Sequence, residues 1–254
     1  MGKPSFLTGE FSYAQYSGIT TVAELLTAIQ TELTALTGAW TVNGSGDYTS
    51  PADAHGRAVN VVITNPSGLY ADFVVTDAAG RSLTNRRILI ANPCVVDIYC
   101  SPNHLIVDCN TTIEVAVICI PDPDPMLAAS CTQCYIALHA TRNSSGTADG
   151  NVDEWDALDN DGSAGTFGVK LTPVMSGDKQ LDAWGNYLFD PPELVCDDFN
   201  YMGTIPHCYL GPEIPAVYSE HTVPLGDGNT GVFRKLGLTN TSAGYDISLY
   251  ARVS

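Results

Sequence analysis

The stretch that decides the fold covers residues 87–120 and reads RILIANPCVVDIYCSPNHLIVDCNTTIEVAVICI. Runs rich in Val and Ile recur along it and are separated by Asn, Asp and Pro, residues that favour tight turns. The pattern predicts successive strands at Arg87–Ala91, Val95–Cys100, Leu105–Asp108 and Thr112–Ile120. The last of these is long and apolar, which is typical of a strand buried on both faces.

The same pattern continues on both sides of this stretch. Further strands are predicted at Arg57–Thr64, Leu69–Thr76, Cys134–Arg142, Val232–Thr239 and Tyr245–Val253. Closely spaced strands with turn residues at each break favour a sandwich or barrel over alternating strand–helix units. We therefore expect a mainly β protein with a β-sandwich or barrel-like core and long loops. Residues 143–165 are expected to form an exposed acidic loop, and residues 174–230 an irregular excursion that contacts neighbouring subunits.

One amphipathic helix is predicted near the N-terminus, over Thr20–Thr37. Its apolar residues share one stripe at helical spacing and should pack on a sheet: Val22, Leu25, Leu26, Ile29, Leu33 and Leu36. Thr21, followed three residues later by Glu24, predicts a capping box at the start. Gly38 is expected just past the end, as the C′ residue.

Length and charge limit the classes of function. The 254 residues suffice for one large β domain or for two units, 1–125 with the helix and 126–254 with the acidic loop and final strands. A formal charge of −17 repels phosphate backbones, so we expect no nucleic-acid partner. No run approaches the roughly 18 apolar residues of a spanning helix, and the N-terminus lacks a signal-peptide pattern. We expect no membrane partner.

Eight cysteines form the most unusual feature of the composition, and all lie between residues 94 and 208. An even number in one region suggests disulfides, whereas a cytosolic origin suggests buried free thiols; both interpretations stay open. The disulfide candidates are Cys94, Cys100, Cys109, Cys119, Cys131, Cys134, Cys196 and Cys208. A zinc site built on Cys131, Cys134, Cys196 and Cys208 is a further hypothesis, although their spacing matches no standard finger.

The acidic stretch ending in Asp159 and Asp161 partly matches a calcium loop. With Gly162 at the sixth position, Ala157 and Gly168 would occupy two positions that need carboxylates, so the EF-hand pattern fails. An irregular calcium site at Asp159 and Asp161 and a solvated acidic loop remain the alternatives. The chain contains no recognisable nucleophile elbow, phosphate-binding loop or paired-histidine metal motif. We therefore expect no enzyme activity, no catalytic residues and no cofactor.

Two segments resemble structural proteins of tailed bacteriophages. One is the helix Thr20–Thr37 followed by Gly-Ala-Trp40-Thr-Val; the other runs from His104-Leu-Ile-Val through Ile118-Cys-Ile-Pro-Asp-Pro to His139–Thr147. The resemblance implies a virion subunit of the neck, collar or tail, assembled in the host cytoplasm. It implies copies of itself and other virion proteins as partners, in a ring-forming homo-oligomer.

Within that class, we expect edge strands such as Tyr245–Val253 to extend a neighbour's sheet, with disulfides stapling the assembly. Two alternatives remain. The first is a capsid decoration protein or a receptor-binding tail or baseplate protein, and the second is a calcium- or zinc-dependent hydrolase.

Overall fold

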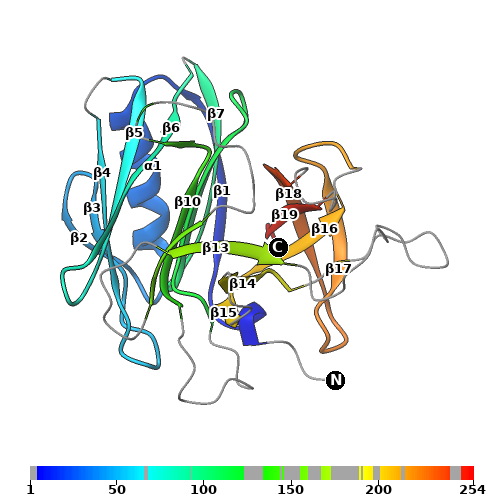
Figure 1. The fold of residues 1–254 in the computed structure, drawn as a ribbon. Helices are drawn as coiled ribbons and strands as arrows, with labels where there is room; N and C mark the ends of the chain where they lie inside the picture. Colours follow the sequence, from blue (N-terminus) through cyan, green and yellow to red (C-terminus); the bar gives the residue numbers. More distant parts are fainter. Residues whose placement is uncertain are drawn as a thin grey trace.

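Within the residues that it describes, a computed structural model of the chain shows three antiparallel sheets, one α-helix and a short 3-10 helix, η1 (Ser5–Leu7) (Figure 1). It describes residues 5–65, 68–91, 93–122, 134–143, 145, 155–159, 167–172, 189, 191–196, 201–212, 215–240 and 247–254. The expectation of a mainly β, sandwich-like fold with an N-terminal helix is confirmed.

The largest sheet, sheet A, has nine strands. In spatial order they are β1 (Ser12–Ile19), β7 (Cys94–Ser101), β8 (His104–Cys109), β9 (Glu114–Cys119), β10 (Cys134–Ala140), β12 (Trp155–Asp159), β13 (Phe167–Thr172), β14 (Glu193–Cys196) and β15 (Tyr201–Thr204). Strands from both 1–125 and 126–254 therefore share one sheet, whichever way the chain divides into folding units.

Two smaller sheets lie on either side of sheet A. Sheet B has six strands, β11 (Arg142–Asn143), β6 (Ser82–Leu89), β5 (Tyr70–Asp77), β4 (Val59–Thr64), β3 (Asp47–Thr49) and β2 (Thr41–Gly44). Sheet C has four, β16 (Cys208–Pro212), β19 (Ile247–Arg252), β18 (Thr230–Asn240) and β17 (Glu220–Pro224).

Helix α1 (Val22–Ala35) lies between sheets A and B and fills the core there (Figure 1). The predicted capping box is present, because Thr21 accepts a hydrogen bond from the Glu24 N–H and the Glu24 carboxylate accepts one from the Thr21 N–H. Leu25, Ile29 and Leu33 are fully buried among residues of both sheets. The apolar stripe of the helix is therefore buried by sheets A and B together.

Strands β7, β8 and β9 are buried on both faces, which explains the apolar stretch at 87–120. Side chains alternate along a strand, so Val96, Ile98 and Val107 face the helix and sheet B. Their neighbours Tyr99 and Ile106 face sheet C. Sheet A is therefore the middle layer of three, and its central strands need apolar residues at almost every position.

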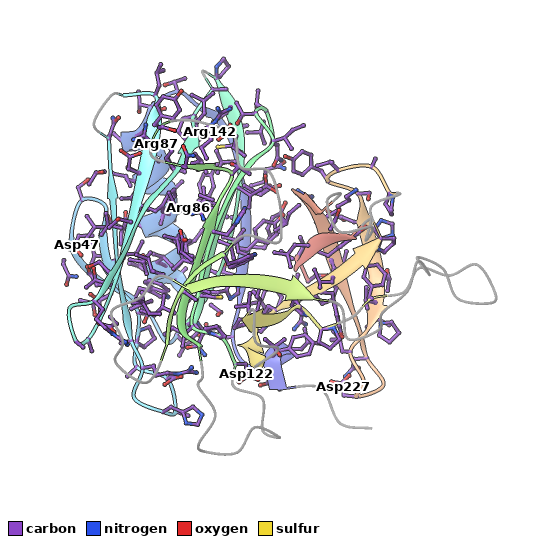
Figure 2. All side chains as sticks on the ribbon, in the orientation of Figure 1. Asp47, Arg86, Arg87, Asp122, Arg142 and Asp227 are labelled. Carbon is purple, nitrogen blue, oxygen red and sulfur yellow. The ribbon has the colours of Figure 1, made fainter. Side chains whose placement is uncertain are left out.

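Ion pairs join sheets A and B, and several come from arginines where β6 pairs with β11; Figure 2 labels Arg86, Arg87 and Arg142. Arg86 on β6 reaches Asp156 on β12 at 2.5 Å, which ties sheet B to sheet A. Arg142 pairs with Glu114 on β9. These bonds supplement the apolar contact between the two sheets.

Several local predictions were wrong. Residues 155–159, assigned to an acidic loop, form β12, because Trp155, Ala157 and Leu158 are buried in sheet A. The predicted irregular excursion at 174–230 contains four strands, β14 to β17. The segment Tyr245–Val253 is no sheet edge, since its strand β19 lies between β16 and β18.

The end of the helix and the first strand also differ from expectation. Leu36 is the C-cap in an extended conformation, so Gly38 is not the C′ residue. Gly38 instead donates its N–H to Glu10. Strand β1 was not predicted at all. None of the helices in the described part of the chain is long and apolar enough to cross a membrane.

Candidate functional site

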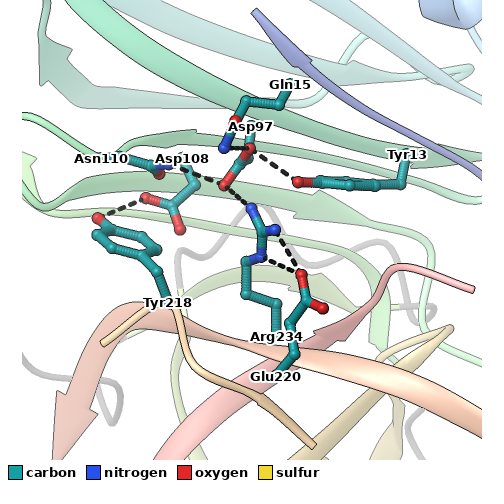
Figure 3. Close-up of polar contacts among 8 residues, drawn as sticks. All are labelled: Tyr13, Gln15, Asp97, Asp108, Asn110, Tyr218, Glu220 and Arg234. Atoms are coloured by element: carbon teal, nitrogen blue, oxygen red, sulfur yellow. Dashed lines mark hydrogen bonds and ion pairs between the residues drawn. The ribbon is translucent and has the colours of Figure 1, made fainter. Parts of the chain in front are cut away.

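A polar cluster lies between sheets A and C, where an apolar interface would be expected (Figure 3). Asp97 on β7 and Asp108 on β8 are direct cross-strand partners, and both are fully buried on the face that points toward sheet C. Two like charges opposite one another destabilise a strand pair. The surrounding residues must offset this repulsion, and we name the whole set the inter-sheet cluster: Tyr13, Gln15, Asp97, Asp108, Asn110, Tyr218, Glu220 and Arg234.

The side-chain oxygens of Asp97 accept four hydrogen bonds. Its Oδ1 accepts hydrogen bonds from the Tyr13 hydroxyl at 3.1 Å and the Gln15 amide at 2.9 Å, both on the adjacent strand β1. Its Oδ2 accepts from the Asn110 amide and from Arg234, each at 2.9 Å. This one side chain therefore receives four donors, one of them the cationic guanidinium of Arg234.

Arg234 is the link between the two sheets. It extends from β18 of sheet C, bonds Asp97 in sheet A and also pairs with Glu220 on the neighbouring strand β17 at 2.5 Å. Its guanidinium lies 5.1 Å from the centre of the Tyr13 ring, a cation–π distance. Burial alone would lower the pKa of Arg234, but the carboxylates of Glu220 and Asp97 raise it, so the side chain stays charged.

Asp108 has far fewer hydrogen-bond donors around its carboxyl than Asp97. Its Oδ1 accepts a bond from the Tyr218 hydroxyl at 3.2 Å, whereas its buried Oδ2 has no partner among the described residues. Burial raises the pKa of Asp108 well above its usual range, and the nearby Asp97 charge raises it further. Of the two carboxyls, Asp108 is therefore the one whose raised pKa favours the protonated form.

The cluster fastens sheet C onto sheet A through charge and hydrogen bonding. Arg234 on β18 bonds Asp97, and the Tyr218 hydroxyl donates a hydrogen bond to Asp108. Sequence reasoning missed these residues, because Arg234 lies 137 positions from Asp97 and no local motif connects them.

A pocket of about 140 Å³ opens near the turn that joins β7 to β8. Ser101, Glu10 and His207 are among its lining residues. The Ser101 hydroxyl lies 2.7 Å from Nδ1 of His104, but the same hydroxyl accepts the Asn103 N–H within the turn. Burial and the neighbouring His207 lower the pKa of His104, so this histidine is neutral. These contacts close the turn and are consistent with a structural role.

The structure places five of the disulfide candidates as buried thiols: Cys94, Cys100, Cys109, Cys119 and Cys208. Cys134 and Cys196 lie on β10 and β14, and their side chains are outside the described residues, as is all of Cys131. Disulfide formation therefore stays a prediction. Among the thiols, Cys94 and Cys109 interact directly with each other.

The zinc set is not assembled by the described backbone. Cys134 lies opposite Asp159, whereas Cys196 lies opposite Val169, which in turn pairs with Trp155. Strands β12 and β13 therefore lie between the two cysteines. Along the strand direction the cysteines are also offset, because Cys134 is level with Asp159 at one end of β12 and Cys196 is level with Trp155 at the other. Strand spacing places them roughly 15 Å or more apart. Two ligands of one zinc ion with Zn–S bonds of about 2.3 Å cannot be so distant.

The calcium hypothesis rests on residues that are only partly described. Asp159 ends β12 and pairs with Cys134 in the sheet, and Asp161 lies outside the described residues. Within the described part, no three histidine, cysteine or acidic side chains are grouped for metal binding.

Comparison with known proteins finds no match to a family model, to a curated protein sequence or to a solved structure.

Proposed function

We propose that the chain is a structural subunit of a tailed-phage particle that assembles in several copies at the neck, collar or tail. One observation carries the assembly part of the proposal: the free outer edge of β1. The place in a phage particle rests on the sequence resemblance described above. Copies of the chain and other virion proteins would be its partners.

Strand β1 ends sheet A and pairs with β7 alone among the described strands. It has eight residues, more than any other edge strand in the described part of the chain. Its sequence, Ser12–Ile19, contains no charged residue and no proline, two common protections of a free edge, and its register against β7 is regular from Ser12 to Ser17 before a shift at Gly18. Gln15, Ser17 and Gly18 are exposed. Such an edge is suited to strand addition by a second chain.

The opposite end of sheet A is better protected. The backbone of Thr204 on β15 forms two hydrogen bonds with Asp122, both of 2.8 Å, which cover part of that edge. The edge of β1 is therefore the more available surface. Two copies joined there would share a continuous sheet, and the net charge of −17 would oppose their association at low salt.

The proposal is tested by the oligomeric state of the purified chain. We expect self-association in the micromolar range that strengthens as sodium chloride screens the charge. Ser17→Lys places a cation on the free edge and should weaken association by about tenfold or more. The measurement is sedimentation velocity over a concentration series, with negative-stain microscopy to detect rings.

Thr84→Lys is the matched control, because Thr84 is an exposed residue on β6 of sheet B, a different sheet from the one that β1 ends. It should associate like the unmodified chain. A chain that stays monomeric at high concentration and high salt contradicts the proposal. If Ser17→Lys and Thr84→Lys associate equally strongly, the edge of β1 is not the contact between copies.

A further inference from the structure

The hairpin of β7 and β8 brings two cysteines together at its open end. Cys109 lies directly opposite Val96, and Cys94 precedes Val96 by two residues. Residues two apart on a strand point to the same face, so Cys94 and Cys109 are diagonal neighbours on one face. Both belong to the core between sheets A and B.

The two thiols are buried and in hydrogen-bonding contact. The bond from Cys109 lowers the pKa of the Cys94 thiol, and the same bond together with burial raises the pKa of Cys109. Cys94 is therefore the more readily ionised of the pair. Burial raises the pKa of Cys100, on the same strand, to about 12, which leaves it a poor nucleophile.

We propose that Cys94 and Cys109 are a redox pair that closes as an intrachain disulfide when the chain meets an oxidising thiol–disulfide environment. As the chain folds, and before the core between sheets A and B closes over it, the Cys94 thiolate attacks one sulfur of a small disulfide such as glutathione disulfide and releases one glutathione. The Cys109 thiolate then attacks Sγ of Cys94 in the mixed disulfide and releases the second glutathione. Two protons and two electrons leave the protein, and one glutathione disulfide becomes two glutathione molecules.

The disulfide would clamp the end of the hairpin that lacks a turn. The other end is already closed by the Ser101–His104 turn. This inference does not rest on the proposed assembly, because both cysteines belong to one chain and both are buried in the core between sheets A and B. It also resolves one pairing among the eight cysteines.

The test is peptide mapping of the full chain, refolded from urea with glutathione and glutathione disulfide, and in parallel with a phosphine reductant. Free thiols are alkylated before digestion. Chymotrypsin can cut after Tyr99 and Leu105, and a glutamate-specific protease after Glu114, so each of Cys94, Cys100 and Cys109 falls in its own peptide. We expect the peptide ending at Tyr99 to be linked to residues 106–114.

Thermal unfolding gives a second measurement. The oxidised chain should melt about 5–10 °C above the reduced chain, as expected for a loop of this size. Cys109→Ser should abolish both the linked peptide and the shift on oxidation. Cys208→Ser, which removes a buried thiol on β16, should keep both.

If Cys109→Ser does not fold, the peptide map of the unmodified chain decides alone. Alkylation of both Cys94 and Cys109 after oxidative refolding overturns the inference. A linked peptide that joins either cysteine to another partner overturns it as well. Neither result would alter the oligomeric state expected from β1, so the two proposals fail separately.

Discussion

Replacement of Arg234 by methionine is expected to lower the free energy of unfolding by about 3–5 kcal/mol at neutral pH. The side chain of Asp97 is completely buried, and Arg234 is its cationic partner at 2.9 Å. Methionine keeps most of the aliphatic volume but leaves the carboxylate without a counter-charge in a medium of low polarity. The three neutral donors that remain on Asp97 offset only part of this cost. Urea unfolding followed by tryptophan fluorescence measures the effect.

Glu220→Gln is the control for this experiment. Glu220 is the second partner of Arg234, but its side chain is 44% exposed. Its loss should cost at most about 1 kcal/mol, because exposed ion pairs contribute little. The double variant Asp97→Asn with Arg234→Met removes both buried charges and should recover part of the stability. A loss below about 1 kcal/mol for Arg234→Met alone would show that the ion pair does not hold the sheets together.

The parts of the fold that the sequence predicts are those whose burial follows from local composition. Strands β7, β8 and β9 are apolar at nearly every position because they are covered on both sides. The helix is predicted to within two residues of its observed ends, since its stripe and its capping box are local signals. These features need no knowledge of distant residues.

The missed strands depend on distant partners. In β1, Tyr16 and Ser12 bond Glu32 of the helix, while Tyr13 and Gln15 face Asp97, so neither face shows an apolar alternation. In β12, acidic residues flank Trp155, and the strand is recognised only through its pairing with β10 and β13. When a buried polar side chain forms its hydrogen bond with a residue far away in the sequence, the residues next to it do not show the alternation that would predict a strand.

The inter-sheet cluster was unpredictable for the same reason. Asp97 and Asp108 are directly opposite each other, an arrangement that a strand pair normally avoids. It is tolerated because Arg234 and Tyr218 arrive from beyond residue 210. The sequence contains these residues among 28 acidic and 11 basic side chains, and only the fold selects which of them meet.

Asp108→Asn is expected to stabilise the protein at neutral pH and to make its stability less dependent on pH. The native carboxyl has a raised pKa because of burial and the neighbouring Asp97, so the folded state binds a proton that the unfolded state releases. Stability contributed by this group is complete below the unfolded pKa of about 3.9 and is lost as pH rises toward the folded pKa, at up to about 1.4 kcal/mol per pH unit. Asparagine is neutral at every pH and can still accept the Tyr218 hydrogen bond.

Urea unfolding between pH 5 and pH 8 tests this expectation, and the gain of Asp108→Asn should grow as pH rises. Asp77→Asn is a useful contrast, since Asp77 is a buried carboxylate that pairs with Arg81 at 2.6 Å and lies in a different sheet. Removing its charge breaks this ion pair and should destabilise the chain. A destabilised Asp108→Asn variant would show instead that Asp108 is ionised in the native state.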